Sequence, residues 1–220
     1  MAEHNVPDRH AVALITVDLQ RDFVCQGSPV QASGVSAALP HIEQILKAFR
    51  DLERPIFHAV RLYRPDGSNV DLCRRSAVEE GLRVLMPGTS GAELIDAVKP
   101  DKSQRLEADA LLEGEFQKLR DNEFVFYKPR WSAFFKTELE ERLRELQINT
   151  LVVTGLNFPT GGRATIYDAG ARDFRVVVGS DALCDAREEA LRELGRIGVY
   201  QMTTDALVEW LYGKRRATAA

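Results

Sequence analysis

Three polar features of the sequence could form one catalytic site. Asp18 ends an apolar run, Lys128 ends a second one, and the turn 157–162 follows a third. The turn leads from an expected strand into an expected helix, a common place for a nucleophile, yet it holds neither Cys nor Ser. A carboxylate, an ammonium group and the N–H groups of a helix N-terminus can together carry acid–base chemistry.

Each charged residue also has an ordinary explanation when taken alone. Asp18 could be a helix N-cap, a position that Asp favours. Lys128 could be a surface lysine. A charge at the end of a buried strand is costly without a partner, however. The two residues are therefore more informative as a pair, provided that their strands are neighbours.

Short apolar runs alternate with amphipathic stretches along the chain. We expect strands at 11–17, 55–63, 123–128, 150–156, 175–182 and 199–204. We expect helices at 41–53, 90–98, 137–147 (with Thr137 as N-cap), 162–174, 187–198 and 205–213. The alternation predicts an α/β fold: a single doubly wound domain with a six-stranded parallel sheet and helices on both faces. The expected domain is 11–213, after an N-terminal extension 1–10 and before a flexible tail 214–220.

Sites in such sheets form at the carboxyl ends of the strands, where Asp18, Lys128 and the turn would meet. The irregular stretch 64–89 is a candidate binding loop. Three aromatic residues just past strand ends are candidates for lining a pocket, with core packing as the alternative: Phe23, Tyr63 and Trp131.

Composition excludes several classes of protein. The 220 residues carry a net charge of −4, so a nucleic-acid partner is not expected. No 18-residue apolar run and no signal peptide are found, so we expect no membrane association and a cytoplasmic protein. The three cysteines, Cys25, Cys73 and Cys184, have no metal-ligand spacing and are expected to be free. No cofactor is expected.

Four motifs resemble the isochorismatase-like hydrolase superfamily, also called the cysteine hydrolases, in order and spacing over about residues 11–205. They are VDLQRDF (17–23), KPRWSAF (128–134), VVTGLNFPTGGRATIYDA (152–169) and RVVVGSDA (175–182). The superfamily includes nicotinamidases, N-carbamoylsarcosine amidases and isochorismatases. The resemblance implies a six-stranded parallel sheet, a small-molecule substrate and a homo-oligomer.

The resemblance also implies roles for individual residues. The family triad of Asp, Lys and Cys falls on Asp18, Lys128 and Gly161, so the nucleophile is absent. The family oxyanion hole uses the backbone N–H groups of Asn157 and Gly161. A non-proline cis peptide, frequent in the family, would fall at Leu156–Asn157.

Isochorismatases resemble the amidases but have glycine at the nucleophile position. They cleave a vinyl ether and release pyruvate without a covalent intermediate. Asp18 would be the general acid, and water would attack in the space that the small Gly161 leaves. This requires a protonated Asp18; burial would favour the proton, and the Lys128 ammonium group would oppose it.

Other features lean toward the amidases. HAVRLYRPDGSNVD (58–71) and NFPTGGR (157–163) resemble an amidase branch, so the chain could be a C–N hydrolase relative that lost its nucleophile and binds ligand without turnover. A structural or partner-binding protein is a third possibility. Four arginines are candidates for binding a substrate carboxylate, although each is expected to be a solvated surface residue: Arg61, Arg74, Arg75 and Arg83.

Replacement nucleophiles and a metal site find little support. Thr160 is adjacent to Gly161, but its side chain would point elsewhere, and Cys184 follows the fifth expected strand. The metal site of nicotinamidases needs a DxH motif and a second His after the second strand. Only His58 is present there, and we expect it to be a structural histidine with satisfied hydrogen bonds.

Overall fold

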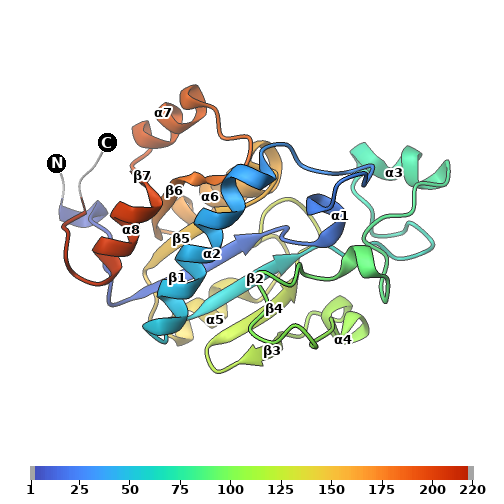
Figure 1. Ribbon diagram of the computed structural model, residues 1–220, viewed down its shortest axis with the longest axis horizontal. Coiled ribbons are helices and arrows are strands. Elements are labelled where there is room, and N and C mark those ends of the chain that lie inside the picture. Colours follow the sequence, from blue (N-terminus) through green and yellow to red (C-terminus); the bar gives the residue numbers. More distant parts are fainter. Residues whose placement is uncertain (1–2, 218–220) are drawn as a thin grey trace.

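A seven-stranded sheet runs through the computed structural model, which describes residues 3–217 (Figure 1). Its strands are β1 (Val12–Val17), β2 (Ile56–Val60), β3 (Gln117–Arg120), β4 (Glu123–Tyr127), β5 (Thr150–Gly155), β6 (Arg175–Leu183) and β7 (Tyr200–Met202). They lie in the order β3-β4-β2-β1-β5-β6-β7. All neighbours are parallel except β3 and β4.

The predicted α/β class is confirmed, but the predicted strand count lacks β3. This edge strand pairs antiparallel with β4 and alternates between buried and exposed positions. Its sequence, QKLR, contains a single apolar residue, so it carries no apolar run by which to recognise it. The other six strands correspond to the six expected apolar runs.

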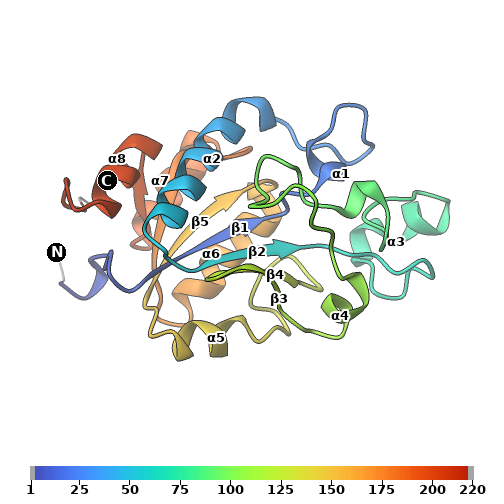
Figure 2. The same ribbon diagram turned by 60° about the horizontal axis from the view of Figure 1, so that its bottom comes forward.

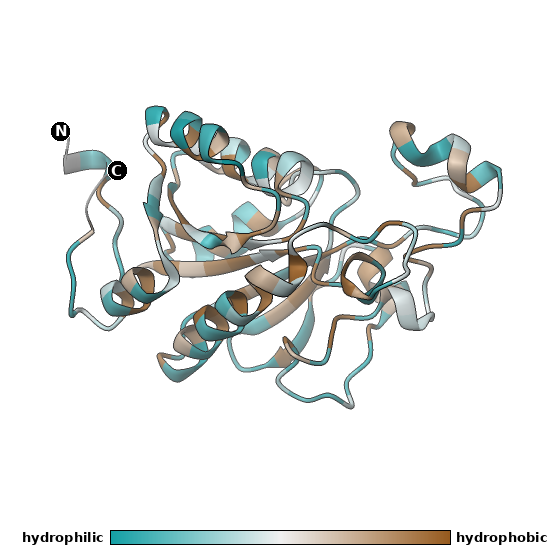
Figure 3. Cartoon of the chain, turned by 45° about the horizontal axis from the view of Figure 1, so that its top comes forward, coloured by the Kyte–Doolittle hydropathy of each residue, from teal (hydrophilic) through white to brown (hydrophobic). Residues whose placement is uncertain are grey.

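Helices cover both faces of the sheet (Figure 2). The helices of the described residues are α1 (Arg21–Val24), α2 (Val35–Asp51), α3 (Leu72–Glu79), α4 (Ala108–Leu112), α5 (Leu139–Glu145), α6 (Arg163–Gly170), α7 (Glu188–Arg196) and α8 (Thr204–Leu211), and α3 lies beyond the ends of the strands (Figure 1). Buried residues of α2 and α8 join one apolar cluster, and those of α5, α6 and α7 join the other. Colouring by hydropathy shows apolar strands between helices whose polar residues face outward (Figure 3).

Several local predictions were wrong. The expected helix 90–98 is a 3₁₀ turn at Ser90–Ala92 followed by extended chain, because Arg21 N–H donates to Glu93 O and Ile95 N–H to Leu19 O. The irregular stretch 64–89 contains α3, and α5 begins at Leu139 with Glu138 as its N-cap. The short helices α1, α3 and α4 were not expected.

The predicted N-terminal extension and C-terminal tail lie only partly within the described residues. The extension 1–10 holds a 3₁₀ turn at Glu3–Asn5, and its first two residues lie outside the described residues. Of the predicted tail 214–220, residues 218–220 also lie outside them. Within residues 3–217, no helix is long and apolar enough to cross a membrane.

Candidate active site

The carboxyl ends of β1, β2, β4 and β5 lie side by side and bring the candidate residues together. Backbone hydrogen bonds fix this edge: Asp18 N–H donates to Ala59 O over 3.0 Å, and Lys128 N–H to Val60 O over 3.0 Å. Leu156 N–H donates to Val17 O over 2.9 Å, so the turn after β5 begins beside Asp18. The three features picked out from the sequence therefore share one edge of the sheet.

Asp18 and Lys128 form a buried ion pair. Lys128 Nζ lies 2.9 Å from Asp18 Oδ1, and the two residues are 0% and 4% exposed, respectively. Apart from this contact, neither atom has a hydrogen-bond partner within the described part of the chain. Asp18 has a left-handed backbone (φ 60°), a conformation often found at functional sites. The pair is closed off from solvent but retains unused hydrogen-bonding capacity.

The charge of Lys128 is easily lost in this environment. Burial lowers its pKa to about 8, although the Asp18 carboxylate acts in the opposite direction. The positive charge of Arg61 lowers the pKa further, and Asp71 raises it. Lys128 can therefore release a proton near neutral pH, which an ordinary lysine cannot do.

Gly161 lies against the ion pair. A Cβ atom at this position would be 3.0 Å from Asp18 Oδ2, 3.0 Å from Val17 Cγ1 and 3.6 Å from Lys128 Nζ. The sequence led us to expect that the small glycine leaves room for water. The Asp18 carboxylate lies close to Gly161, so a side chain here would press on it, and the expected space for water stays a prediction.

The turn between β5 and α6 is a π-helical segment, Phe158–Gly162. The peptide Leu156–Asn157 is trans, so the expected cis peptide was wrong, and Asn157 instead has a left-handed backbone with φ 53°. Gly155, before it, has φ 127°, and a Cβ there would lie 2.6 Å from Val17 N. Only glycine permits this approach of β5 to β1. The oxyanion role of the Asn157 and Gly161 N–H groups stays a prediction.

The turn is also tied to the segment after β4. Thr165 Oγ1 donates to Gly161 O over 2.7 Å and accepts from Ala133 N–H over 3.0 Å. Thr160 Oγ1 donates to Asn157 O over 3.3 Å, so it caps its own turn, in agreement with the expectation that it points away from the pair. The TGG sequence is thus held on both sides.

A second polar cluster lies beside the first. Arg61 is 2% exposed and forms an ion pair with Asp71, the N-cap residue of α3; Tyr63 Oη donates to Asp71 Oδ2 over 2.9 Å. The expectation of a surface arginine was therefore wrong for Arg61. Burial raises the pKa of Tyr63 to about 12, so its hydroxyl stays a donor.

The other three arginines differ in burial. Arg74 and Arg75 are half-buried, and Arg74 Nη1 donates to Tyr63 Oη over 3.1 Å. Arg83 is exposed, as expected, and bonds carbonyls at the end of α3 and just after it. Of the four candidates, Arg61 and Arg74 thus belong to the polar cluster around Asp71.

The predicted aromatic residues occupy different environments. Phe23 and Tyr63 are buried, and the guanidinium group of Arg74 lies 5.6 Å from the centre of the Phe23 ring. Trp131 is 46% exposed and lines a mostly apolar hollow of about 420 Å³. Asp71 reaches the wall of this hollow, so the hollow adjoins the second polar cluster.

Other candidates are structural. His58 is buried, with Nδ1 2.8 Å from Thr16 Oγ1 and Nε2 3.0 Å from Glu123 Oε1, which confirms a histidine with satisfied hydrogen bonds. Burial raises the pKa of the Cys184 thiol to about 12, so it is not a thiolate. Within residues 3–217, no group of three His, Cys, Asp or Glu side chains could hold a metal ion.

Sequence reasoning missed Gln20 and Asp71. Gln20 is fully buried at the end of the VDLQ motif, and Asp71 follows the polar run RPDGSN. Gln20 could have been found, because it lies in a family motif two residues after Asp18. No signal in the sequence pairs Asp71 with Arg61.

Comparison with known proteins places the chain in a family. The isochorismatase domain matches residues 12–206. A probable inactive nicotinamidase of Arabidopsis thaliana is 28% identical over 204 residues, covering 90% of this chain and 93% of that protein. A ureidoacrylate amidohydrolase of Methylorubrum extorquens is also 28% identical, covering 84% and 75%.

A solved structure agrees. An isochorismatase family protein from Desulfovibrio vulgaris subsp. vulgaris str. Hildenborough is 30% identical, covers 92% of this chain and 98% of its own, and superposes with a TM-score of 0.76. The domain match spans most of the chain, and the fold agrees with that of the solved family member. The protein therefore belongs to the isochorismatase family.

Proposed function

We propose that this protein hydrolyses a small molecule without a cysteine nucleophile, with Asp18 as general acid and water as the attacking group. The best specific candidate is a vinyl ether whose hydrolysis releases pyruvate, as in isochorismate. The observation that supports this most is the intact Asp18–Lys128 pair, 2.9 Å apart and buried, beside a residue with no side chain. An unused buried ion pair brings little or no stability over apolar residues, so its presence favours a chemical role.

The proposed reaction balances with one water molecule. The proton of the pair, carried by Lys128 at neutral pH, passes to Asp18 and then to the terminal carbon of the enol ether, whose π electrons form the new C–H bond. The ether carbon becomes an oxocarbenium ion, and water adds to it. The water's proton returns to the pair. The hemiketal then breaks its C–O bond to give an alcohol and pyruvate. A general acid of this kind contributes about 10²- to 10⁴-fold.

Substrate must reach a pair that this structure closes off from solvent. The hollow beside Trp131 is mostly apolar with polar residues in its wall, and Asp71 joins it to the polar cluster. We propose that the apolar part of the substrate lies there and that Phe23 and Tyr63 shape the inner wall. Opening at the hollow, next to α3, would then admit the reacting group.

A second function is favoured by the tight contact at Gly161 and by similarity to a probable inactive nicotinamidase. In that alternative the protein is an amidase relative that binds an amide-like ligand without turnover. Calorimetry with small amides and carbamoyl compounds, followed by product analysis of the same samples, distinguishes the two. Binding without product would support the alternative.

The direct test of the main proposal is pyruvate release from isochorismate, with Asp18→Asn as the matched variant. Asparagine keeps the shape of the side chain but holds no transferable acid proton. Release by the wild type and its loss in the variant are expected. Homo-oligomer formation, a second proposal from the resemblance, is tested by light scattering of the same samples.

A further inference from the structure

Arg61 is a second buried cation within the candidate site. It follows β2 directly and is 2% exposed, between the Asp18–Lys128 pair and the Asp71–Tyr63 cluster. Placing a guanidinium group near a buried ammonium group costs free energy, since neither charge is solvated and the two repel. The position of Arg61 therefore suggests that it acts on the neighbouring ion pair.

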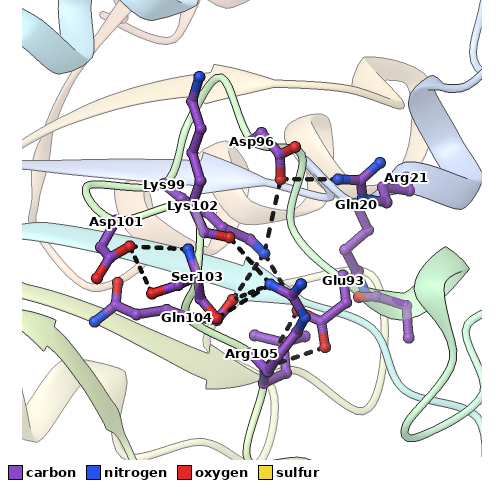
Figure 4. A network of polar contacts seen from close by, with 12 residues as sticks. Gln20, Arg21, Glu93, Asp96, Lys99, Asp101, Lys102, Ser103, Gln104 and Arg105 are labelled. Carbon is purple, nitrogen blue, oxygen red and sulfur yellow. Dashed lines mark hydrogen bonds and ion pairs between the residues drawn. The ribbon is translucent and has the colours of Figure 1, made fainter.

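The backbone of Arg61 is held by Gln20. Gln20 Oε1 accepts from Arg61 N–H over 2.7 Å, and Gln20 Nε2 donates to Arg61 O over 2.7 Å and to Ala92 O over 2.7 Å. Arg21, the residue after Gln20, belongs to a separate polar network, in which its Nη2 lies 2.8 Å from Asp96 Oδ1 (Figure 4). Gln20 thus ties the backbone of Arg61 to the residues just after β1 and to the end of the 3₁₀ turn Ser90–Ala92.

The guanidinium group joins the two clusters. Its Nη1 donates to the backbone carbonyl of Lys128 over 3.3 Å, and its Nη2 forms the ion pair with Asp71. Asp71 in turn accepts from Tyr63 Oη. One side chain therefore holds the backbone of Lys128 from one end and the start of α3 from the other.

We propose that Arg61 is a positioning residue for Lys128: its guanidinium group holds the Lys128 backbone and places a second buried positive charge beside the ion pair. Three charged groups face Lys128: Asp18 after β1, Arg61 after β2 and Asp71 before α3. Arg61 lowers the pKa of Lys128, whereas Asp18 and Asp71 raise it. The inference rests on the proposed function for its kinetic meaning, because a less basic Lys128 passes its proton to Asp18 more readily.

The charge state of Lys128 can be measured without any substrate. NMR of protein labelled with ¹³C at lysine Cε follows its titration, with the signal assigned by its absence in Lys128→Met. Arg61→Met is expected to raise the midpoint by about one pH unit, since it removes the repelling charge. Asp71→Asn is expected to lower the midpoint, since it removes a negative charge that raises the pKa of Lys128. Arg83→Met replaces an exposed arginine that follows α3, so it is the matched control and should leave the midpoint unchanged.

The opposite signs separate this role from a merely structural one. A folded Arg61→Met protein with an unchanged Lys128 midpoint would overturn the inference. If that variant does not fold, Arg61→Gln, which removes the charge but keeps a hydrogen-bonding side chain, decides, and an unchanged midpoint overturns the inference equally. With isochorismate, the alkaline limb of the rate profile should move with the midpoint. Absence of pyruvate from the wild type refutes the proposed function alone, because the NMR titration still decides the role of Arg61.

Discussion

Two adjacent glycines make a sharp test of how closely the site is packed. Neither Gly161 nor Gly162 has a positive φ, so alanine suits both backbones and reduces the entropy of the unfolded chain equally. The surroundings differ. At Gly161 the new methyl group would lie 3.0 Å from Asp18 Oδ2 and Val17 Cγ1, whereas at Gly162 its closest contact is Phe158 Cδ2 at 3.4 Å.

The expected difference follows from these contacts. Carbon atoms pack best at about 3.5–4.0 Å, and overfilling a packed core costs about 1–3 kcal/mol. Gly162→Ala is expected to stabilise the fold by about 0.4–1 kcal/mol. Because both variants share the entropic gain, Gly161→Ala should be less stable than Gly162→Ala by about the overpacking cost, 1–3 kcal/mol. Val17 lies within the central strand β1 and cannot retreat, so Asp18 must shift.

Urea unfolding followed by circular dichroism measures the difference. The same cost applies to Gly161→Cys, whose Cβ takes the same place, so restoring a cysteine should also displace Asp18. Equal stability of the two alanine variants would show that the space before Gly161 is open, and the account of a filled site would be wrong.

Two further predictions concern the ion pair. Lys128→Met leaves the Asp18 carboxylate buried without its partner and should lower the free energy of unfolding by about 3–5 kcal/mol. The double variant Asp18→Asn/Lys128→Met removes both charges and should regain most of this loss. A double variant that is no more stable than Lys128→Met in urea unfolding would contradict this prediction. The pKa of Lys128 is lowered to about 8 from 10.5, so the unfolded chain binds more protons between these values. The contribution of this group to stability should therefore rise with pH across that window, whereas turnover should fall as pH rises through about 8; urea midpoints and rates from pH 6 to 10 check both.

The elements at the carboxyl edge were predictable because buried parallel strands appear as continuous apolar runs. Those runs end at Asp18 and Lys128, and because sites in such sheets form at the carboxyl ends of the strands, the sequence predicts that the two residues lie together. The edge strand β3 and the failed helix 90–98 could not be predicted, since their form depends on pairing with β4 and with the residues just after β1.

The polar cluster shows the same limit. Arg61 resembles any surface arginine in sequence, and only the fold brings Asp71 and Gln20 to it. The contacts around Gly161 could not be predicted either. The residue type shows that no side chain is present, but only the fold places the Asp18 carboxylate and Val17 beside it.

The most direct test of the central claim is pyruvate release from isochorismate by the wild type and by Asp18→Asn, measured at pH 7 in one assay. The account predicts release by the wild type and a loss of at least about 100-fold in the variant, since a general acid contributes about 10²- to 10⁴-fold. Equal release by both proteins, or no release by either, would contradict vinyl-ether hydrolysis with Asp18 as general acid.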